Sequence, residues 1–318
     1  MNENNNIPPL NESNENNNLA PGKNIIPKIS PVLAAFIGLI GGFILYQGVG
    51  GLLTLAIFGF DIQNAPVNSV RLMTIAGQIL FMLLPSLILA KAFYEDVGYI
   101  IRFNLPSWEE LLLFTIGLAI LTPLMEYFLS IQNHFFTLWS ANSSFIHTIK
   151  TFLDRLDDLV DKTYGNLLSA RTIFDGILVV FVAAVIPAIC EEVMFRGFIQ
   201  KSFEFKLKPF TSALITAIFF GLYHFNPYAL IPLIALGLYF GFAAYLSGSI
   251  FVPISLHFIN NFMAVIFYFI FGDNDVLNTA VSKSFDLSSS LMIFCGLSAL
   301  FAVTIYLIKR YYSRRNNI

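Results

Sequence analysis

The stretch FDGILVVFVAAVIPAI, residues 174–189, carries no charge after Asp175 and leads directly into CEEVMFRGF, residues 190–198. Together the two segments are long enough to cross the roughly 30 Å of bilayer hydrocarbon as a helix. Glu191, Glu192 and Arg196 are placed before such a helix can end. Ionisable side chains at membrane depth are costly and usually serve a function. This stretch therefore predicts a membrane-spanning helix that carries a polar functional site.

The composition of the whole chain agrees with a membrane protein. Of the 318 residues, 56% are hydrophobic and 12% are charged, whereas a soluble domain carries about 25% charged residues. Apolar segments of spanning length recur along the chain. We expect an all-α, polytopic membrane helical bundle of about eight transmembrane helices, with spans at 31–59, 70–93, 108–131, 173–200, 210–229, 230–247, 250–271 and 289–308.

The two ends of the chain and its Lys and Arg residues predict the orientation. Residues 1–29 are Asn-rich and lack a signal-peptide pattern, so we expect a disordered cytoplasmic tail ahead of one transmembrane helical domain at 30–318. With eight spans, most Lys and Arg outside the long loop fall on the side that holds both termini. Because cytoplasmic loops are enriched in these residues, we expect a multi-pass protein of the cell membrane with both termini cytoplasmic.

The long loop at 132–171 is expected on the outer side. Its segment FLDRLDDLVDKTYGNLL, residues 152–168, places apolar residues at helical spacing. This pattern predicts an amphipathic helix that lies on the membrane surface or over the bundle. His134 and His147 belong to the same loop and are expected to be solvated.

The spacing within the polar stretch predicts a buried ion pair. Glu192 and Arg196 are four residues apart, so in a helix they share one face and can pair. Glu191 is rotated by about 100° from Glu192 and needs a different partner or a water. Pro187, four residues before Glu191, removes a backbone hydrogen bond and should open the helix at this point.

Two later spans also carry polar residues at membrane depth. His224 lies near the end of the fifth expected span without a polar partner close in sequence. His257 and Asn261 share a face of the seventh, whereas Asn260 points about 100° away. Pro253 precedes His257 by four residues, so this helix too should open just before its polar residues.

The depths of Glu191 and His224 in the membrane, estimated from helix length, do not agree. At 1.5 Å per residue, Glu191 lies roughly 15 Å from Lys201 and His224 roughly 24 Å from Lys208. The two polar side chains should nevertheless reach the same depth if they act together. We therefore expect the segment KLKP at 206–209 to end one helix and start another, with an interfacial stretch at 201–210.

The polar residues form three motifs that resemble a known family. The motifs are Glu191-Glu192-xxx-Arg196, then Phe220-xxx-His224, then His257-xxx-Asn261. This order is similar to the signature of the CPBP intramembrane proteases, also called the CAAX prenyl endopeptidase or Abi family. The resemblance covers about residues 170–275 and implies an intramembrane endopeptidase that hydrolyses a peptide bond of a membrane-associated protein.

The resemblance also implies roles for the individual residues. Glu191, helped by His224, would activate a water for attack on the scissile carbonyl. His257 and Asn261 would stabilise the oxyanion that develops. The remaining residues of the first motif, Glu192 and Arg196, would hold the helix geometry.

The cofactor is left open between two mechanisms. Glu191, His224 and His257 offer one carboxylate and two imidazoles, which is a ligand set of catalytic zinc centres. A zinc ion would lower the pKa of a bound water and act as Lewis acid. Without a metal, Glu191 and His224 would activate the water directly. We expect a divalent metal, zinc, with the metal-free mechanism as the alternative.

Other functions remain possible for polar residues inside a membrane bundle. Such residues can line the path of a transporter, and the same fold can act as a non-proteolytic scaffold or immunity protein. The sequence contains neither HExxH nor GxSxG, the motifs of other intramembrane protease classes. Glu126 matches no motif, and we expect a structural role for it. The expected partners are the lipid bilayer and a membrane-associated protein or peptide substrate, with no nucleic acid, and the oligomeric state is open.

Overall fold

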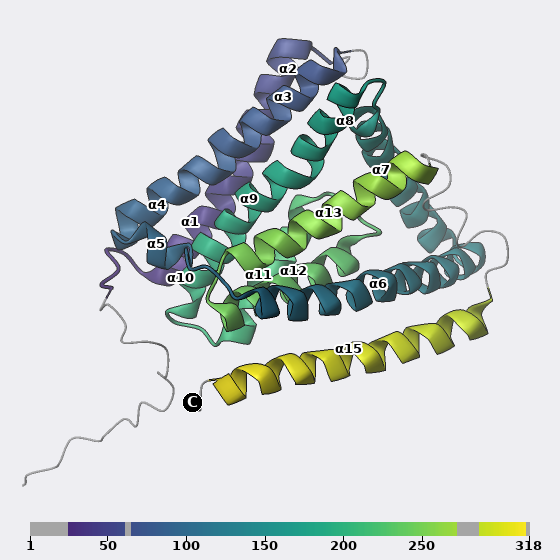
Figure 1. The fold of residues 1–318 in the computed structure, drawn as a ribbon. Helices are drawn as coiled ribbons and strands as arrows, with labels where there is room; N and C mark the ends of the chain where they lie inside the picture. The colour runs from purple at the N-terminus through teal and green to yellow at the C-terminus, as the bar shows by residue number, and fades with distance from the viewer. Residues whose placement is uncertain (1–24, 61–64, 272–285, 316–318) are drawn as a thin grey trace, which may run out of the picture.

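The computed structural model describes residues 25–60, 65–271 and 286–315, and these residues form helices and no strand. The predicted all-α membrane bundle is thereby confirmed (Figure 1). Seven helical segments in the described part are long and apolar enough to cross a membrane. They are Pro31–Phe58, Val67–Tyr94, Trp108–Asn142, Ile173–Glu204, Leu230–Ser247, Phe251–Phe271 and Leu287–Arg315. Of the predicted tail, residues 1–24 lie outside the described part, and Ile25 and Ile29 pack against the bundle.

The fifth expected span is shorter than predicted. The helix α11 (Pro209–Tyr223) has 15 residues, fewer than the roughly 20 that a span requires. It ends at Tyr223 with His224 as its C-cap residue, after which Phe225 takes a positive φ of 51°. Asn226 then accepts a hydrogen bond from the amide of Ala229, which forms a turn. The prediction that 210–229 is one span is therefore wrong, because the backbone reverses after His224.

The fourth spanning helix is longer than predicted, and this resolves the question of depth. Its last part, α10 (Gln200–Glu204), ends at Glu204 instead of residue 200, and α11 begins with Pro209 in its first turn. The predicted break at 206–209 is therefore confirmed. At 1.5 Å per residue, Glu191 lies roughly 20 Å from Glu204, and His224 lies roughly 22 Å from Pro209. The two side chains thus reach the same depth from the same end of the bundle.

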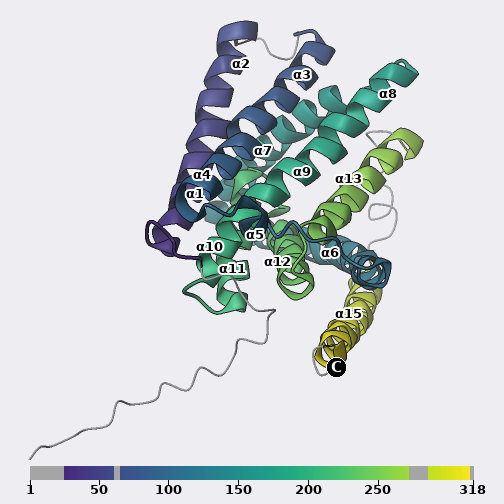
Figure 2. The same ribbon diagram turned by 60° about the vertical axis from the view of Figure 1, so that its left-hand side comes forward.

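Ion pairs gather several chain segments at one end of the bundle. Lys28, ahead of α1 (Pro31–Phe43), pairs with Glu95 after α4 (Leu84–Tyr94) at 2.9 Å. Glu110, in the first turn of α6 (Trp108–Asn142), pairs with Arg315 at the end of α15 (Leu287–Arg315) at 2.8 Å. Both described chain ends therefore lie at this end (Figures 1 and 2). That it faces the cytoplasm remains a prediction.

The expected outer loop at 132–171 is mostly helical. α6 continues to Asn142, and α7 (Ser144–Leu168) follows after Ser143, whose side chain caps α7 by accepting from the amide of Ile146. The third span therefore ends later than predicted, while the predicted amphipathic helix at 152–168 is confirmed as part of α7. Its apolar residues Phe152 and Leu159 are exposed. This exposure agrees with a helix that lies on the membrane surface.

The helix that bears the polar stretch is not a regular α-helix. After α8 (Ile173–Val180) it is π-helical at Phe181–Val185, α-helical again in α9 (Ile186–Glu192), and π-helical at Val193–Ile199. The irregularity on either side of Pro187 agrees with its predicted effect. Pro253 has no such effect, because it lies in the first turn of α13 (Phe251–Phe271), where the missing amide costs no helical bond. The prediction of an opening before His257 is therefore wrong.

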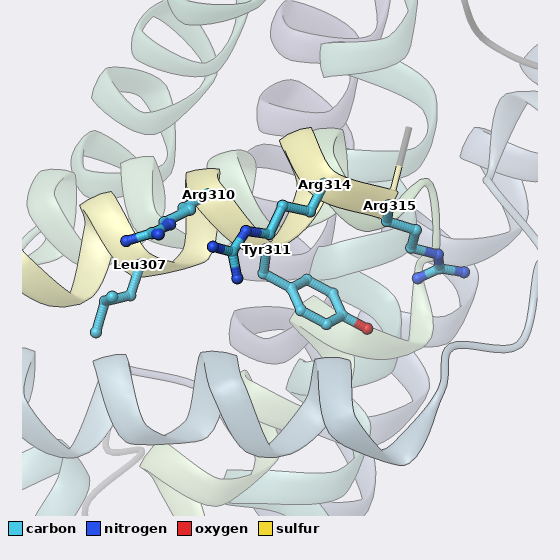
Figure 3. Close-up of a pocket in the computed structure, with 5 residues that line it drawn as sticks. All are labelled: Leu307, Arg310, Tyr311, Arg314 and Arg315. Atoms are coloured by element: carbon cyan, nitrogen blue, oxygen red, sulfur yellow. The ribbon is translucent and has the colours of Figure 1, made fainter. Parts of the chain in front are cut away.

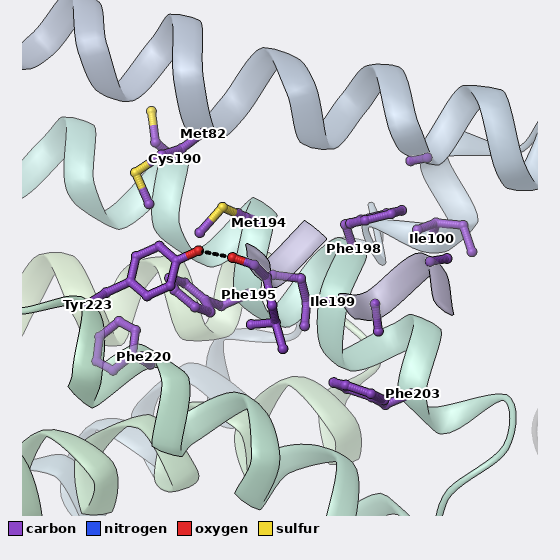
Figure 4. Packing of buried hydrophobic residues seen from close by; sticks show 14 of the residues in the cluster. Met82, Ile100, Cys190, Met194, Phe195, Phe198, Ile199, Phe203, Phe220 and Tyr223 are labelled. Atoms are coloured by element: carbon purple, nitrogen blue, oxygen red, sulfur yellow. Dashed lines mark hydrogen bonds between the residues drawn. The ribbon is translucent and has the colours of Figure 1, made fainter. Parts of the chain in front are cut away.

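A buried apolar cluster holds this helix in place. Cys190, Met194, Phe195 and Phe198 pack with residues of α1, α4 and α11 (Figure 4). Within the cluster the hydroxyl of Tyr223 donates to a main-chain carbonyl of α1. Side chains that are fully packed in this way resist rotation of the helix. The cluster therefore sets the direction in which the polar side chains of the same helix point.

Candidate active site

Glu192 and Arg196 form the predicted ion pair, and both side chains are completely buried. Nη1 of Arg196 lies 2.8 Å from Oε1 of Glu192, and Nη2 donates to the carbonyl of Gly237 at 3.1 Å. The guanidinium carbon lies 4.3 Å from the ring centroid of Phe220. The charge of Arg196 is therefore balanced on one side by a carboxylate and covered on the other by an aromatic face.

His257 joins the same carboxylate from a different helix. Its Nδ1 lies 2.8 Å from Oε1 of Glu192. Because an ionised carboxylate only accepts hydrogen bonds, Nδ1 carries the hydrogen and donates it. The ring of Phe240 stacks on the imidazole at 5.5 Å between centroids. Glu192 thus links the first and third motifs and fixes the orientation of His257.

Glu191 turns away from this pair and faces His224. Oε2 of Glu191 and Nε2 of His224 are 4.0 Å apart, with 13% and 22% of the two side chains exposed. Nδ1 of His224 lies 2.7 Å from the carbonyl of Phe220 and must donate to it. Nε2 therefore points towards Glu191, whose Oε2 has no hydrogen-bond partner among the described residues.

Oε2 of Glu191 and Nε2 of His224 are separated by a distance that a bridging water can span. A distance of 4.0 Å is too long for a direct hydrogen bond. A water that contacts both groups can bridge such a separation. Glu191 therefore points away from Arg196, as the helical rotation predicted, and faces His224 without a direct hydrogen bond.

Asn261 contacts the backbone of the irregular helix four residues before Pro187. Its Nδ2 donates to the carbonyl of Ala183 at 2.9 Å. In an α-helix the donor to this carbonyl would be the amide of residue 187, which a proline lacks. The side chain of Asn261 replaces that donor and ties α13 to the irregular helix. Sequence reasoning missed Ala183, although its place four residues before a proline marks its carbonyl as free.

The structure brings three of the six predicted site residues to one aromatic side chain and links the other three to them or to the helix beside them. The ring of Phe220 contacts the guanidinium of Arg196 and lies 4.7 Å from the ring of His224 and 6.0 Å from that of His257. Glu192 bridges Arg196 and His257, Glu191 faces His224, and Asn261 lies one turn beyond His257. Glu126 is on α6, exposed, and outside this group of contacts.

Gly237 and Gly241 allow the helices around the site to approach closely. They lie on α12 (Leu230–Ser247), which packs against α11. A Cβ on Gly237 would lie 3.1 Å from the ring of Phe220 and 3.2 Å from Cβ of Ala217. The absence of side chains at this contact is what brings the Gly237 carbonyl within reach of Arg196.

The predicted zinc ligands Glu191, His224 and His257 meet some of the requirements of a metal site and not others. Each imidazole donates its Nδ1 hydrogen, His224 to a carbonyl and His257 to a carboxylate, which is the arrangement typical of histidines that bind a metal through Nε2. No three His, Cys, Asp or Glu side chains gather closely enough to hold an ion in the described part of the chain. Glu191 and His224 face each other, and a third ligand is not brought to them. Zinc therefore remains a prediction, and no step of the chemistry is derived through it.

The fold and the site define a class of protein, a polytopic membrane protein with a carboxylate and a histidine that face each other inside the helical bundle. Residues 173–263 match the family described as Rce1-like, type II CAAX prenyl endopeptidase Rce1-like. This segment contains all three motifs, and the match confirms the predicted resemblance to the CPBP, or CAAX protease, family. The match supports an intramembrane protease at the level of the family. Comparisons with curated proteins and with solved structures gave no match.

Proposed function

We propose that the protein is an endopeptidase that cleaves a membrane-associated protein with a water activated by Glu191 and His224. The observation that supports this proposal is the pair of facing atoms, Oε2 of Glu191 and Nε2 of His224, separated by 4.0 Å. Both atoms are acceptors, since Nδ1 of His224 already donates to Phe220. A water between them can donate one hydrogen to each and direct a lone pair away from both.

The reaction follows from these positions. Glu191 accepts a proton as the water oxygen attacks the scissile carbonyl carbon, and the carbonyl oxygen becomes an oxyanion. The tetrahedral intermediate then collapses, the C–N bond breaks, and the proton held by Glu191 passes to the leaving amine. The products are a carboxylate and an amine.

Asn261 and His257 are the proposed oxyanion donors. The amide of Asn261 has two hydrogens, and its contact with Ala183 uses one of them. His257 donates from Nε2 when its ring is protonated, because Nδ1 is engaged by Glu192. Glu192 would then provide the counter-charge for the imidazolium. Donors that are oriented before the reaction stabilise the transition state most effectively.

The substrate can be found by comparing membrane proteomes of cells that carry the wild-type protein or Glu191→Gln. We expect full-length forms of one or more membrane proteins to accumulate in the variant, with loss of their cleaved products. Glu126→Gln, which neutralises a membrane carboxylate outside the site, is the matched control and should leave the cleavage pattern unchanged. Identical proteomes in all three strains would refute the proposed function. If a substrate is found, the presence or absence of a prenyl group on it identifies the substrate class.

Pro187→Ala tests whether the free carbonyl of Ala183 positions Asn261. The alanine amide can donate to that carbonyl as in a regular helix, so we expect Asn261 to be released. The loss of one oriented oxyanion donor should lower kcat by about 10²-fold, while KM stays similar and thermal stability is maintained or increased. Pro253→Ala is the control, because that proline lies in the first turn of α13. Unchanged kcat in Pro187→Ala would show that Asn261 does not depend on this carbonyl.

The zinc prediction has a separate test. If it is correct, elemental analysis of the purified protein finds stoichiometric zinc, His224→Ala loses it, and chelation abolishes activity until zinc is added back. Full activity after rigorous chelation, with metal at background, would instead support direct activation of the water by Glu191 and His224. The two outcomes leave the identity of the site residues unchanged and differ in how the water is activated, by a metal that lowers its pKa or by a general base that accepts its proton.

A further inference from the structure

The end of α15 carries a hollow that is separate from the site described above. Its volume is about 640 Å3, and its lining residues are Leu307, Arg310, Tyr311, Arg314 and Arg315 (Figure 3). Residues three and four apart in a helix lie on one side of it. The hollow is therefore a feature of one face of α15, at the end of the bundle that holds both described chain ends.

Two of the cations in this hollow have no acidic partner among the described residues. Arg315 pairs with Glu110 at 2.8 Å and is therefore engaged within the protein. Arg310 and Arg314 are exposed, and none of the acidic side chains in the described ranges forms an ion pair with either. Guanidinium groups bind phosphate through paired hydrogen bonds. Two unpaired ones side by side favour an anion with several acceptor oxygens.

The same face of α15 is apolar beyond the hollow. Leu300, Val303 and Leu307 are 50%, 54% and 48% exposed, and their spacing places them in line with Arg310 and Arg314. Figures 1 and 2 show α15 lying along α6 at the edge of the bundle, away from α1 and α4. This face therefore meets lipid, with its apolar part inside the membrane and its cations at the membrane boundary.

We propose that this hollow binds the headgroup of an anionic phospholipid. The phosphate would lie between Arg310 and Arg314, and an acyl chain would lie along Leu307, Val303 and Leu300. A soluble anion would use the two cations and leave the apolar stripe without a role. A phospholipid uses both, because its charge and its acyl chains are joined at the depth where the cationic and apolar parts of α15 meet.

The test compares two double variants of the full-length protein in detergent. Arg310→Gln/Arg314→Gln removes the proposed contacts, and Lys206→Gln/Lys208→Gln removes two exposed cations at the same end of the bundle but outside the hollow. Each protein is titrated with phosphatidylglycerol, with phosphatidylcholine and with inorganic phosphate. Bound lipid is counted by native mass spectrometry, and the Tm is measured in parallel.

We expect phosphatidylglycerol to bind the wild type and the Lys206/Lys208 control equally and to raise their Tm. Binding to Arg310→Gln/Arg314→Gln should be about 30-fold weaker, since each cation near the membrane surface contributes about a fivefold effect. Phosphatidylcholine should bind all three proteins alike. Equal binding of phosphatidylglycerol to both double variants would overturn the proposal. A Tm increase with inorganic phosphate as large as that with phosphatidylglycerol would also overturn it, in favour of a site for a free anion.

Discussion

Glu191→Gln is expected to lower kcat by about 10³-fold, because a glutamine cannot accept the proton of the attacking water. The substitution keeps the size and shape of the side chain, and Oε2 of Glu191 has no hydrogen-bond partner among the described residues that could be lost. The Tm should therefore be unchanged or slightly higher. The measurement is steady-state cleavage of a peptide that contains the site found in the proteomic comparison, with purified protein in a bilayer mimic.

Glu126→Gln is the control for this experiment and should retain wild-type kcat. His224→Ala should show a loss similar to that of Glu191→Gln, because the two side chains act on the same water. Retained cleavage in both Glu191→Gln and His224→Ala would exclude the proposed mechanism. If proteoliposomes showed solute flux that these substitutions abolish, without any peptide product, the chain would be a transporter.

Arg196→Met is expected to destabilise the protein by about 3–5 kcal/mol, because it leaves the carboxylate of Glu192 buried without its counter-charge. Both side chains are 0% exposed, and the change also removes the hydrogen bond to the carbonyl of Gly237. Yield and Tm should therefore fall together with activity. The size of this effect distinguishes a structural ion pair from a catalytic group.

The double variant Glu192→Gln/Arg196→Met should recover a large part of the lost stability. It replaces the buried carboxylate with a neutral amide whose oxygen can still accept from His257. Lys206→Met is the control for loss of an exposed cation and should leave the Tm unchanged. If Arg196→Met were as stable as the wild type and yet inactive, Arg196 would be a catalytic group, and its role as a partner of Glu192 would be wrong.

Local geometry explains why parts of this protein could be predicted from sequence. The apolar runs predicted eight membrane spans, of which seven are long membrane helices in the described part of the chain. The four-residue spacing of Glu192 and Arg196 predicted their contact, which the structure confirms at 2.8 Å. Both predictions depend only on the rise and periodicity of a helix. The three motifs were enough to indicate the family, because their residue types and order do not depend on how the helices pack.

The tertiary structure alone decided how the motifs meet. The contact between Glu192 and His257 joins residues 65 apart in the chain, and the 4.0 Å gap between Glu191 and His224 depends on the rotation of two separate helices. Such rotations are set by packing, as at Gly237, where a single Cβ would press against Phe220. For the same reason we did not predict the early end of α11. Nor did we predict the hydrogen bond from Asn261 to the carbonyl of Ala183. The sequence by itself determined which side chains enter the membrane, and the packing of the helices determined which of them face one another.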